Sequence, residues 1–267
     1  MIKVNKNLDD IPESLKPATD AFFGGSKIPQ ITRTTHRKRL EVIENRSYDD
    51  SFDGRYKLED IKESLNSIYH HKCAFCEQRV EQIQVEHYRP KKTYYWLAFS
   101  WDNLLLACQT CNIAKGSQFS IDGPMVNFIV NDENINQINS FSSSYDETER
   151  PLTVNPEVIE PEGKIEFSKD GKINSNDKRF KHTIEKACKL NRKDLLDQRR
   201  KIIENFKEEI QAELAICGDV DEQYKALGTI MRGFKRRAYD CEETFLAFRQ
   251  FALNNGWLDE CIKELIH

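Results

Sequence analysis

The residues of this 267-residue chain whose spacing most clearly predicts chemistry are two Cys-x-x-Cys pairs, Cys73/Cys76 and Cys108/Cys111. Each pair can sit on a tight turn that directs both sulfur atoms at one point, and two such turns supply the four thiolates of a tetrahedral zinc site. The pairs therefore predict one structural Zn²⁺. The other four of the eight cysteines lie scattered through helix-like sequence, where a thiol is usually a small buried hydrophobe, and we expect no metal from them: Cys188, Cys217, Cys241 and Cys261.

Polar residues suited to phosphodiester hydrolysis lie between the two cysteine pairs and directly after the second pair. His87 is the natural general base, because its unperturbed pKa lets it accept a proton near neutrality. Glu86 offers a hard oxygen to Mg²⁺ or Mn²⁺, and Asn112 offers an amide oxygen as a second ligand. A metal ion held there would polarise the scissile phosphate and stabilise the leaving oxygen. The zinc-held cluster therefore predicts phosphodiester hydrolysis at a second, hard metal ion.

Three basic residues, Lys115, Arg89 and Lys91, are placed to meet the phosphates of a nucleic-acid backbone. Arg89 and Lys91 have an alternative interpretation, in which they only form salt bridges. The Glu86-His87 pair taken alone would more often be an exposed surface pair than a site. The cysteine pairs on either side favour a site, because a structural zinc needs no further polar groups at that place.

The elements expected to position these residues surround the cysteine pairs. Residues 79–87 alternate well enough for a strand that delivers Glu86 and His87 at its end. An amphipathic helix over 57–70 leads into the first pair, where His70 and His71 could replace a thiolate but more simply end the helix against its dipole. The apolar run 94–99 predicts a segment buried beside the two Cys-x-x-Cys turns, the zinc knuckles. The alternative is that its aromatic side chains stack on nucleic-acid bases. The leucine-rich run 101–107 could form a turn of helix.

Outside this unit the chain divides into further segments. Residues 131–150 are rich in Asn, Ser, Asp and Glu and predict a mobile linker or insert. Asp170-Gly171 predicts the tight turn of a hairpin over 164–173. From Asp177 onward the sequence is typical of helices, with breaks expected at Asn191, Gly218, Gly233 and Gly256. The division we expect is an irregular and helical N-terminal segment, a core with the zinc knuckles, a linker with the hairpin, and a helical C-terminal region: 1–56, 57–125, 126–176 and 177–267.

Charge and composition bound the class of protein. The formal net charge of -4 is unusual for a protein that grips nucleic acid alone. The charges are segregated, however: acids dominate 131–162, whereas Lys and Arg dominate 177–201 and recur at 232–237. These runs fit solvated helix faces, a nucleic-acid track or a docking surface for a partner. The absence of a long apolar run argues against secretion and membrane insertion, and we expect a cytoplasmic protein.

The central unit resembles a known family. The order and spacing of His87, Asn103 and Asn112 are similar to the HNH, or ββα-metal, nuclease motif framed by zinc knuckles. Short segments around this motif resemble the HNH endonucleases of bacterial Septu-type and retron-associated anti-phage systems, the PtuB-like proteins. These segments are Cys73–Glu77, Val85–Lys91, Tyr94–Ala98, Trp101–Leu106 and Cys108–Gly116. The resemblance is tight over 57–119 and weaker over 151–156, the hairpin and 177–200. One departure is that Asn112 stands where the motif often has a histidine.

The resemblance implies an α+β fold, in which a zinc-knuckle ββα-metal (HNH) core is flanked by N-terminal helices and a mostly helical C-terminal region. It also implies that Asn103 braces the loop that carries His87, and that the chain acts with an ATPase of the ABC or SMC-like kind, PtuA-like, in anti-phage defence. The expected substrate is nucleic acid, DNA in preference to RNA. Two alternatives remain: a non-catalytic zinc-stapled module that only binds nucleic acid, and a mobile-element or restriction HNH nuclease.

Overall fold

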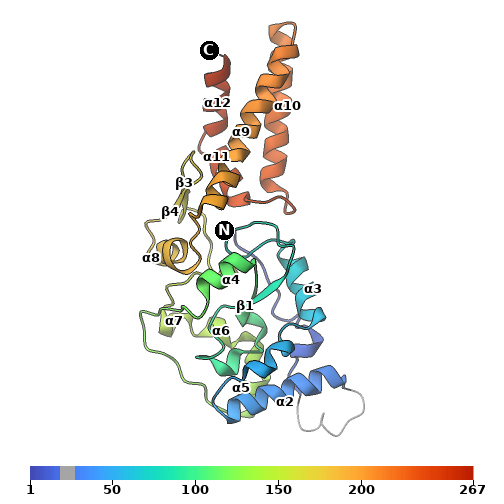
Figure 1. Cartoon of the computed structure of the whole chain (residues 1–267), viewed down its shortest axis with the longest axis vertical. Helices are drawn as coiled ribbons and strands as arrows, with labels where there is room; N and C mark the ends of the chain where they lie inside the picture. The colour runs from blue at the N-terminus through green and yellow to red at the C-terminus, as the bar shows by residue number, and fades with distance from the viewer. Residues whose placement is uncertain (19–27, 267) are drawn as a thin grey trace.

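The computed structural model describes residues 1–18 and 28–266, and Figure 1 shows two parts stacked along the long axis of the molecule. The lower part holds the N-terminal helices and the central unit, and the upper part consists of the C-terminal helices. No described helix is both long enough and apolar enough to span a bilayer. The α-helices are α2 (Gln30–Glu44), α3 (Glu59–Ile68), α4 (Gln109–Lys115), α5 (Asp132–Asn136), α6 (Phe141–Ser144), α7 (Asp146–Glu149), α8 (Lys178–His182), α9 (Lys193–Ile216), α10 (Val220–Tyr239), α11 (Leu246–Asn254) and α12 (Trp257–Ile266).

The centre of the lower part is a hairpin followed by a helix. Strand β1 (Gln84–His87) pairs antiparallel with β2 (Leu104–Ala107), and α4 begins directly after the second strand. The predicted strand that ends in Glu86 and His87 is confirmed, and so is the α+β class. The expectation of a helical turn over 101–107 is wrong for its second half. Only Trp101–Asn103 forms a 3₁₀ turn, and the leucines that follow are buried strand residues.

Residues 131–150 do not form the mobile linker that their polar composition predicted. They fold into α5, α6 and α7 with a 3₁₀ turn between α5 and α6, and they pack against the central unit. Ile138, Ser142 and Glu149 are completely buried there. Their side chains are ordered because they meet partners from the central unit, and composition alone does not reveal such partners.

The C-terminal helices form the upper part of the molecule. Helices α9 and α10 run side by side as a long antiparallel pair, and α12 packs along α9 (Figure 1). Phe206 and Phe234 meet edge to face between the two long helices, with ring centroids 5.4 Å apart. Gly233 lies inside α10, so the predicted break there is wrong. The nearby Phe234 and Ala238 are buried, and their packing stabilises the helix across the glycine. A single hydrophobic core joins these helices to the central unit.

A short hairpin connects the two parts. Strands β3 (Glu166–Phe167) and β4 (Ile173–Asn174) pair antiparallel, which confirms the predicted hairpin. Gly171 occupies the turn at a φ of +85°, a conformation that favours glycine. Phe167 packs edge to face on Phe248 of α11, so the hairpin is fixed to the C-terminal helices.

Candidate active site

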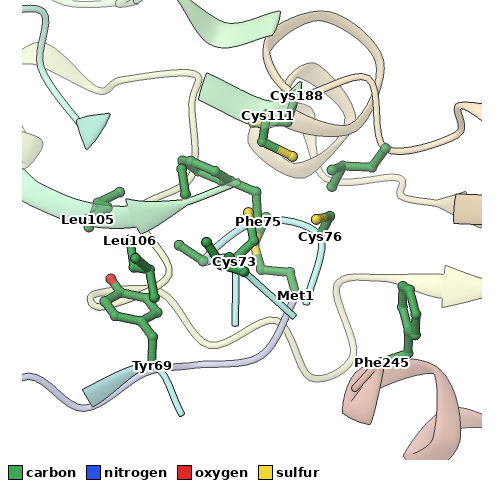
Figure 2. Close-up of a cluster of buried hydrophobic side chains, with 14 of the residues drawn as sticks. Met1, Tyr69, Cys73, Phe75, Cys76, Leu105, Leu106, Cys111, Cys188 and Phe245 are labelled. Carbon is green, nitrogen blue, oxygen red and sulfur yellow. The ribbon is translucent and has the colours of Figure 1, made fainter. Parts of the chain in front are cut away.

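The four predicted cysteine ligands come together. The sulfur atoms of Cys73, Cys76, Cys108 and Cys111 all lie within 4.8 Å of one another. Figure 2 shows Cys76 and Cys111 approaching one point from two segments of the chain. The Sγ atoms of Cys76 and Cys108 are 3.7 Å apart, close to the roughly 3.8 Å expected between two thiolates on a tetrahedral ion with metal–sulfur bonds of about 2.3 Å. The donor set therefore fits a metal ion, and four thiolates favour zinc.

Local backbone geometry explains why each pair can bind one ion. In the first pair, Glu77 adopts a left-handed φ of +62° and its N–H donates to the carbonyl of Cys73 at 3.0 Å, which closes the turn. In the second pair, Cys108 caps α4 and its Sγ accepts from the N–H of Cys111 at 3.4 Å. Four thiolates on one divalent ion leave a net negative charge. The guanidinium of Arg192 partly compensates it, because it lies 3.5 Å from the sulfur of Cys111.

His87 lies at the end of β1 with its ring buried. Its Nε2 is 2.9 Å from the carbonyl oxygen of Ala98. A carbonyl only accepts, so Nε2 carries the proton and Nδ1 keeps its lone pair. The ring of Tyr56 meets the imidazole edge to face, at 4.4 Å between centroids. Burial lowers the pKa of His87 to about 3, so the imidazole is neutral at physiological pH.

Glu86 forms a buried ion pair with Lys115. The Nζ atom of Lys115 lies 2.6 Å from Oε1 of Glu86 and also donates to the carbonyl of His87 at 2.7 Å. Burial raises the pKa of Glu86, and the nearby ammonium opposes that rise. The Lys115 side chain is completely buried. Such a lysine is not available to a substrate phosphate, which was its expected role; instead it holds a positive charge against Glu86.

Asn103 forms a network of buried hydrogen bonds around the His87 segment. Its Oδ1 accepts from the N–H of Arg89 at 2.8 Å, and its Nδ2 donates to the carbonyls of Arg89 and Leu97 at 3.0 and 3.1 Å. The hydroxyl of Ser142 also donates to Oδ1, at 3.1 Å. Asn103 thus ties the residues after His87 to the segment that supplies Ala98. This is the geometry that a bracing role requires.

Arg89 and Lys91 lie in ion pairs. The guanidinium of Arg89 is completely buried and contacts Glu149 at 3.0 Å and Asp146 at 2.9 Å. It therefore cannot reach a substrate phosphate, and its expected role there does not fit. Lys91 contacts Asp53, and it also donates to the hydroxyl of Tyr56 at 3.0 Å. The salt-bridge interpretation describes both residues.

Asn112 lies in α4, three residues before Lys115 and so on the same side of the helix. That helix packs against β1, which carries Glu86 and His87. The Asn112 side chain is half-buried. Glu86 therefore faces α4 through its ion pair with Lys115, whereas its neighbour His87 points to the other side of β1, toward Tyr56 and Ala98.

Several contacts at this site were not predicted from the sequence, among them the Ala98 carbonyl and the Tyr56 ring on His87, and Arg192 on the cysteine cluster. Ala98 acts through its backbone, so no side-chain pattern could have revealed it. Tyr56 and Arg192 come from outside the tight motif region and meet the site only after folding. The buried segment 94–99 was foreseen, but most of its large side chains form a separate small core with Ile138 and Tyr145 instead of packing on the knuckles.

Comparison with known proteins places the same residues in a family. Residues 73–118 match the HNH endonuclease family. The chain is 30% identical over 226 residues to the Septu protein PtuB of Bacillus mycoides strain KBAB4, an alignment that covers 77% of this chain and 68% of that protein. It is 39% identical over 71 residues to the Septu protein PtuB of Bacillus thuringiensis, covering 25% of this chain and 28% of that protein. It is also 23% identical over 161 residues to the Septu protein PtuA of Bacillus mycoides strain KBAB4, covering 55% of this chain and 21% of that protein.

Proposed function

Because the chain belongs to the PtuB-like HNH proteins of the Septu defence family, we propose that it is a metal-dependent endonuclease that hydrolyses phosphodiester bonds as the effector of an anti-phage system. The observation that carries the proposal is the state of His87. Its Nε2 donates to the carbonyl of Ala98 at 2.9 Å, which leaves the lone pair of Nδ1 as the proton acceptor. A non-catalytic binding module has no need for a histidine fixed in this tautomer.

In the proposed phosphodiester hydrolysis, each residue of the site has a separate role. Nδ1 of His87 takes a proton from the attacking water, and the Ala98 carbonyl keeps the ring from turning. Asn103 positions this segment and does not touch the substrate. The carboxylate of Glu86 and the amide oxygen of Asn112 are hard donors that suit Mg²⁺ or Mn²⁺. When bound, such an ion supplies charge neutralisation at the phosphate and the leaving oxygen.

The four-cysteine cluster serves a structural role in this proposal. Zn²⁺ held by Cys73, Cys76, Cys108 and Cys111 joins the segment before β1 to the start of α4. Strand β1, which follows the first cysteine pair, carries His87, and α4 carries Asn112, so the ion holds the two elements together. Its binding free energy then contributes to folding of the unit, and Cys108→Ser should give insoluble or metal-free protein.

We further propose DNA as the substrate and a PtuA-type ATPase as the partner, acting in the cytoplasm. A similar chain carries the name PtuA, and a net charge of -4 gives this chain little long-range attraction for a polyanion on its own. A partner that binds the nucleic acid would supply the attraction that this chain lacks.

The test compares His87→Ala with wild type in cleavage of plasmid DNA, using the full chain together with its ATPase partner and added Mg²⁺ or Mn²⁺. Loss of a general base should lower the rate by about 10²–10⁴-fold while zinc content and nucleic-acid binding stay unchanged. His71→Ala is the matched control, because that histidine is exposed and its ring contacts Asn66, outside the candidate site. A His87→Ala protein that cleaves at the wild-type rate would refute the mechanism and favour the binding module.

A further inference from the structure

A second cluster of metal-binding side chains lies where the central unit meets the C-terminal helices. His70 follows α3, and Cys241 and Glu242 lie in the connection between α10 and α11. One donor atom from each residue lies within 4.8 Å of the other two. Nδ1 of His70 is 3.0 Å from Oε1 of Glu242, across 172 positions of sequence. None of the three belongs to the four-cysteine cluster.

The backbone around the cluster is held in place from both sides. The buried ammonium of Lys72 donates to the carbonyls of Cys241 and Glu243, and so fixes the connection against the segment that leads into the first cysteine pair. Within the connection, Oδ1 of Asp240 accepts from the N–H of Glu242 at 3.0 Å. His70 itself adopts a left-handed φ of +49° as α3 ends, which is uncommon for a residue with a side chain.

We propose that His70, Cys241 and Glu242 bind a second Zn²⁺, with water as the fourth ligand. A thiolate, an imidazole and a carboxylate are all established zinc donors, and three protein ligands with one open position form a common zinc geometry. Metal–ligand bonds of about 2.0–2.3 Å place tetrahedral donors roughly 3.3–3.8 Å apart. The 3.0 Å between Nδ1 of His70 and Oε1 of Glu242 lies just below that range, and the other spacings are at most 4.8 Å, so small rotations of the exposed Cys241 and Glu242 side chains bring the three donors to tetrahedral spacing.

This ion joins the two parts of the molecule. The four-cysteine site connects two segments inside the central unit, whereas this site connects the end of α3 to the C-terminal helices. Binding therefore stabilises the interface between them. Because the site is open to solvent and has fewer thiolates, its affinity for Zn²⁺ is lower than that of the four-cysteine site. Its occupancy therefore depends on the free zinc concentration.

A simpler interpretation of the same geometry is a surface pair between His70 and Glu242, with the Cys241 thiol taking no part. The thiol separates the two interpretations. The expectation that Cys241 is a small buried hydrophobe is wrong, because its thiol is exposed beside a histidine and a carboxylate.

The experiment uses the full chain purified with its four-cysteine site loaded, titrated with Zn²⁺ for stoichiometry and with Co²⁺ for the thiolate-to-metal charge-transfer band. Wild type should bind about one further equivalent per chain, and the band should appear with it. Cys241→Ser and Glu242→Gln should each lose that equivalent while keeping the first ion. Cys217→Ser is the matched control, since it removes a half-exposed thiol at the far end of α9 and should bind like wild type.

A second readout is limited proteolysis of the connection between α10 and α11. Added Zn²⁺ should slow cleavage there in wild type and in Cys217→Ser, but not in Cys241→Ser. The proposal is overturned if wild type takes up no further equivalent, or if Cys241→Ser keeps it together with the charge-transfer band. Neither readout involves His87 or cleavage of nucleic acid, so the result is independent of the proposed nuclease function.

Discussion

Removing the ammonium of Lys115 should destabilise the protein strongly, because it leaves the carboxylate of Glu86 buried without a partner. The two charged atoms are 2.6 Å apart and both side chains are at most 5% exposed. At an effective dielectric constant of 20, the Coulomb attraction across this distance is about 6 kcal/mol. Part of that cost is avoided when Glu86 takes up a proton. We therefore expect Lys115→Met to lower the free energy of unfolding by about 3–5 kcal/mol.

The pH dependence of this loss follows from the pKa of Glu86. Without Lys115, the folded-state pKa of Glu86 rises further above the unfolded value, so the folded variant binds a proton on Glu86 more readily than the unfolded chain does. The folded variant therefore keeps its stability at low pH and loses it as pH rises toward the folded-state pKa of Glu86. The loss in Lys115→Met should be larger at about pH 8 than at about pH 5, by up to about 1.4 kcal/mol per pH unit.

The assay is urea unfolding of wild type, Lys115→Met and the control Lys16→Met at both pH values. Lys16 forms an exposed pair with Glu13, so its removal should cost less than about 1 kcal/mol at either pH. Mg²⁺ should restore part of the stability of Lys115→Met, because a divalent ion on Glu86 replaces the missing charge. A loss as small as in the control, or one that does not change with pH, would refute the buried-pair reasoning.

Two further pairs of variants probe buried charge and backbone strain. Burial lowers the pKa of His36 to about 4 and raises that of Asp102 to about 7. Relative to His36→Gln, wild type should therefore lose stability as pH falls from about 6.5 to about 4. Relative to Asp102→Asn, wild type should lose stability as pH rises from about 4 to about 7. Urea unfolding should show each change as up to about 1.4 kcal/mol per pH unit. Gly163 and Gly171 both have left-handed φ, but only at Gly171 would an added Cβ meet a backbone oxygen of α9, at 2.5 Å. Gly163→Ala should cost about 1–2 kcal/mol and Gly171→Ala at least twice that, so equal shifts in unfolding midpoint would contradict the packing argument.

The sequence predicted the parts of the fold that local spacing controls. Two Cys-x-x-Cys pairs and an alternating strand were enough to place Glu86 and His87 beside a four-thiolate cluster. The roles of Arg89 and Lys115 could not be read in the same way. A cation beside a metal-binding motif suits a phosphate contact and a buried ion pair equally well, and the choice depends on acids distant in sequence, such as Asp146 and Glu149 for Arg89.

The same limit explains why the segment 131–150 was interpreted as a linker. Its polar residues are typical of a solvated segment, but several of them point inward. Ser143 donates its N–H to Asp102, Asn139 accepts from the N–H of Trp101, and Glu149 accepts from Arg89 and Tyr94. Each bond satisfies a buried polar group of the central unit. A polar sequence can thus belong to a core when its partners are themselves polar.

These internal pairs change what the net charge implies for nucleic-acid binding. Three acids of the run 131–162 are paired within the fold, where Asp146 and Glu149 meet Arg89 and Glu157 meets Lys6. These three contribute little to the field outside, whereas the other acids of the run are exposed: Asp132, Glu133, Glu147, Glu160 and Glu162. In the basic run, by contrast, several lysines are exposed and form no salt bridge within 1–18 and 28–266: Lys181, Lys186, Lys189 and Lys193.

The position of these lysines bears on the three roles left open for the basic run, which are a solvated face, a nucleic-acid track and a docking surface. Residues 183–187 pack against α4, the helix that carries Asn112, and they follow directly on α8. The positive charge is consequently local to the candidate active site, where short-range attraction for a phosphate backbone persists in spite of a net negative charge. A track for the substrate fits this arrangement better than a docking surface, which would need no such proximity to Asn112.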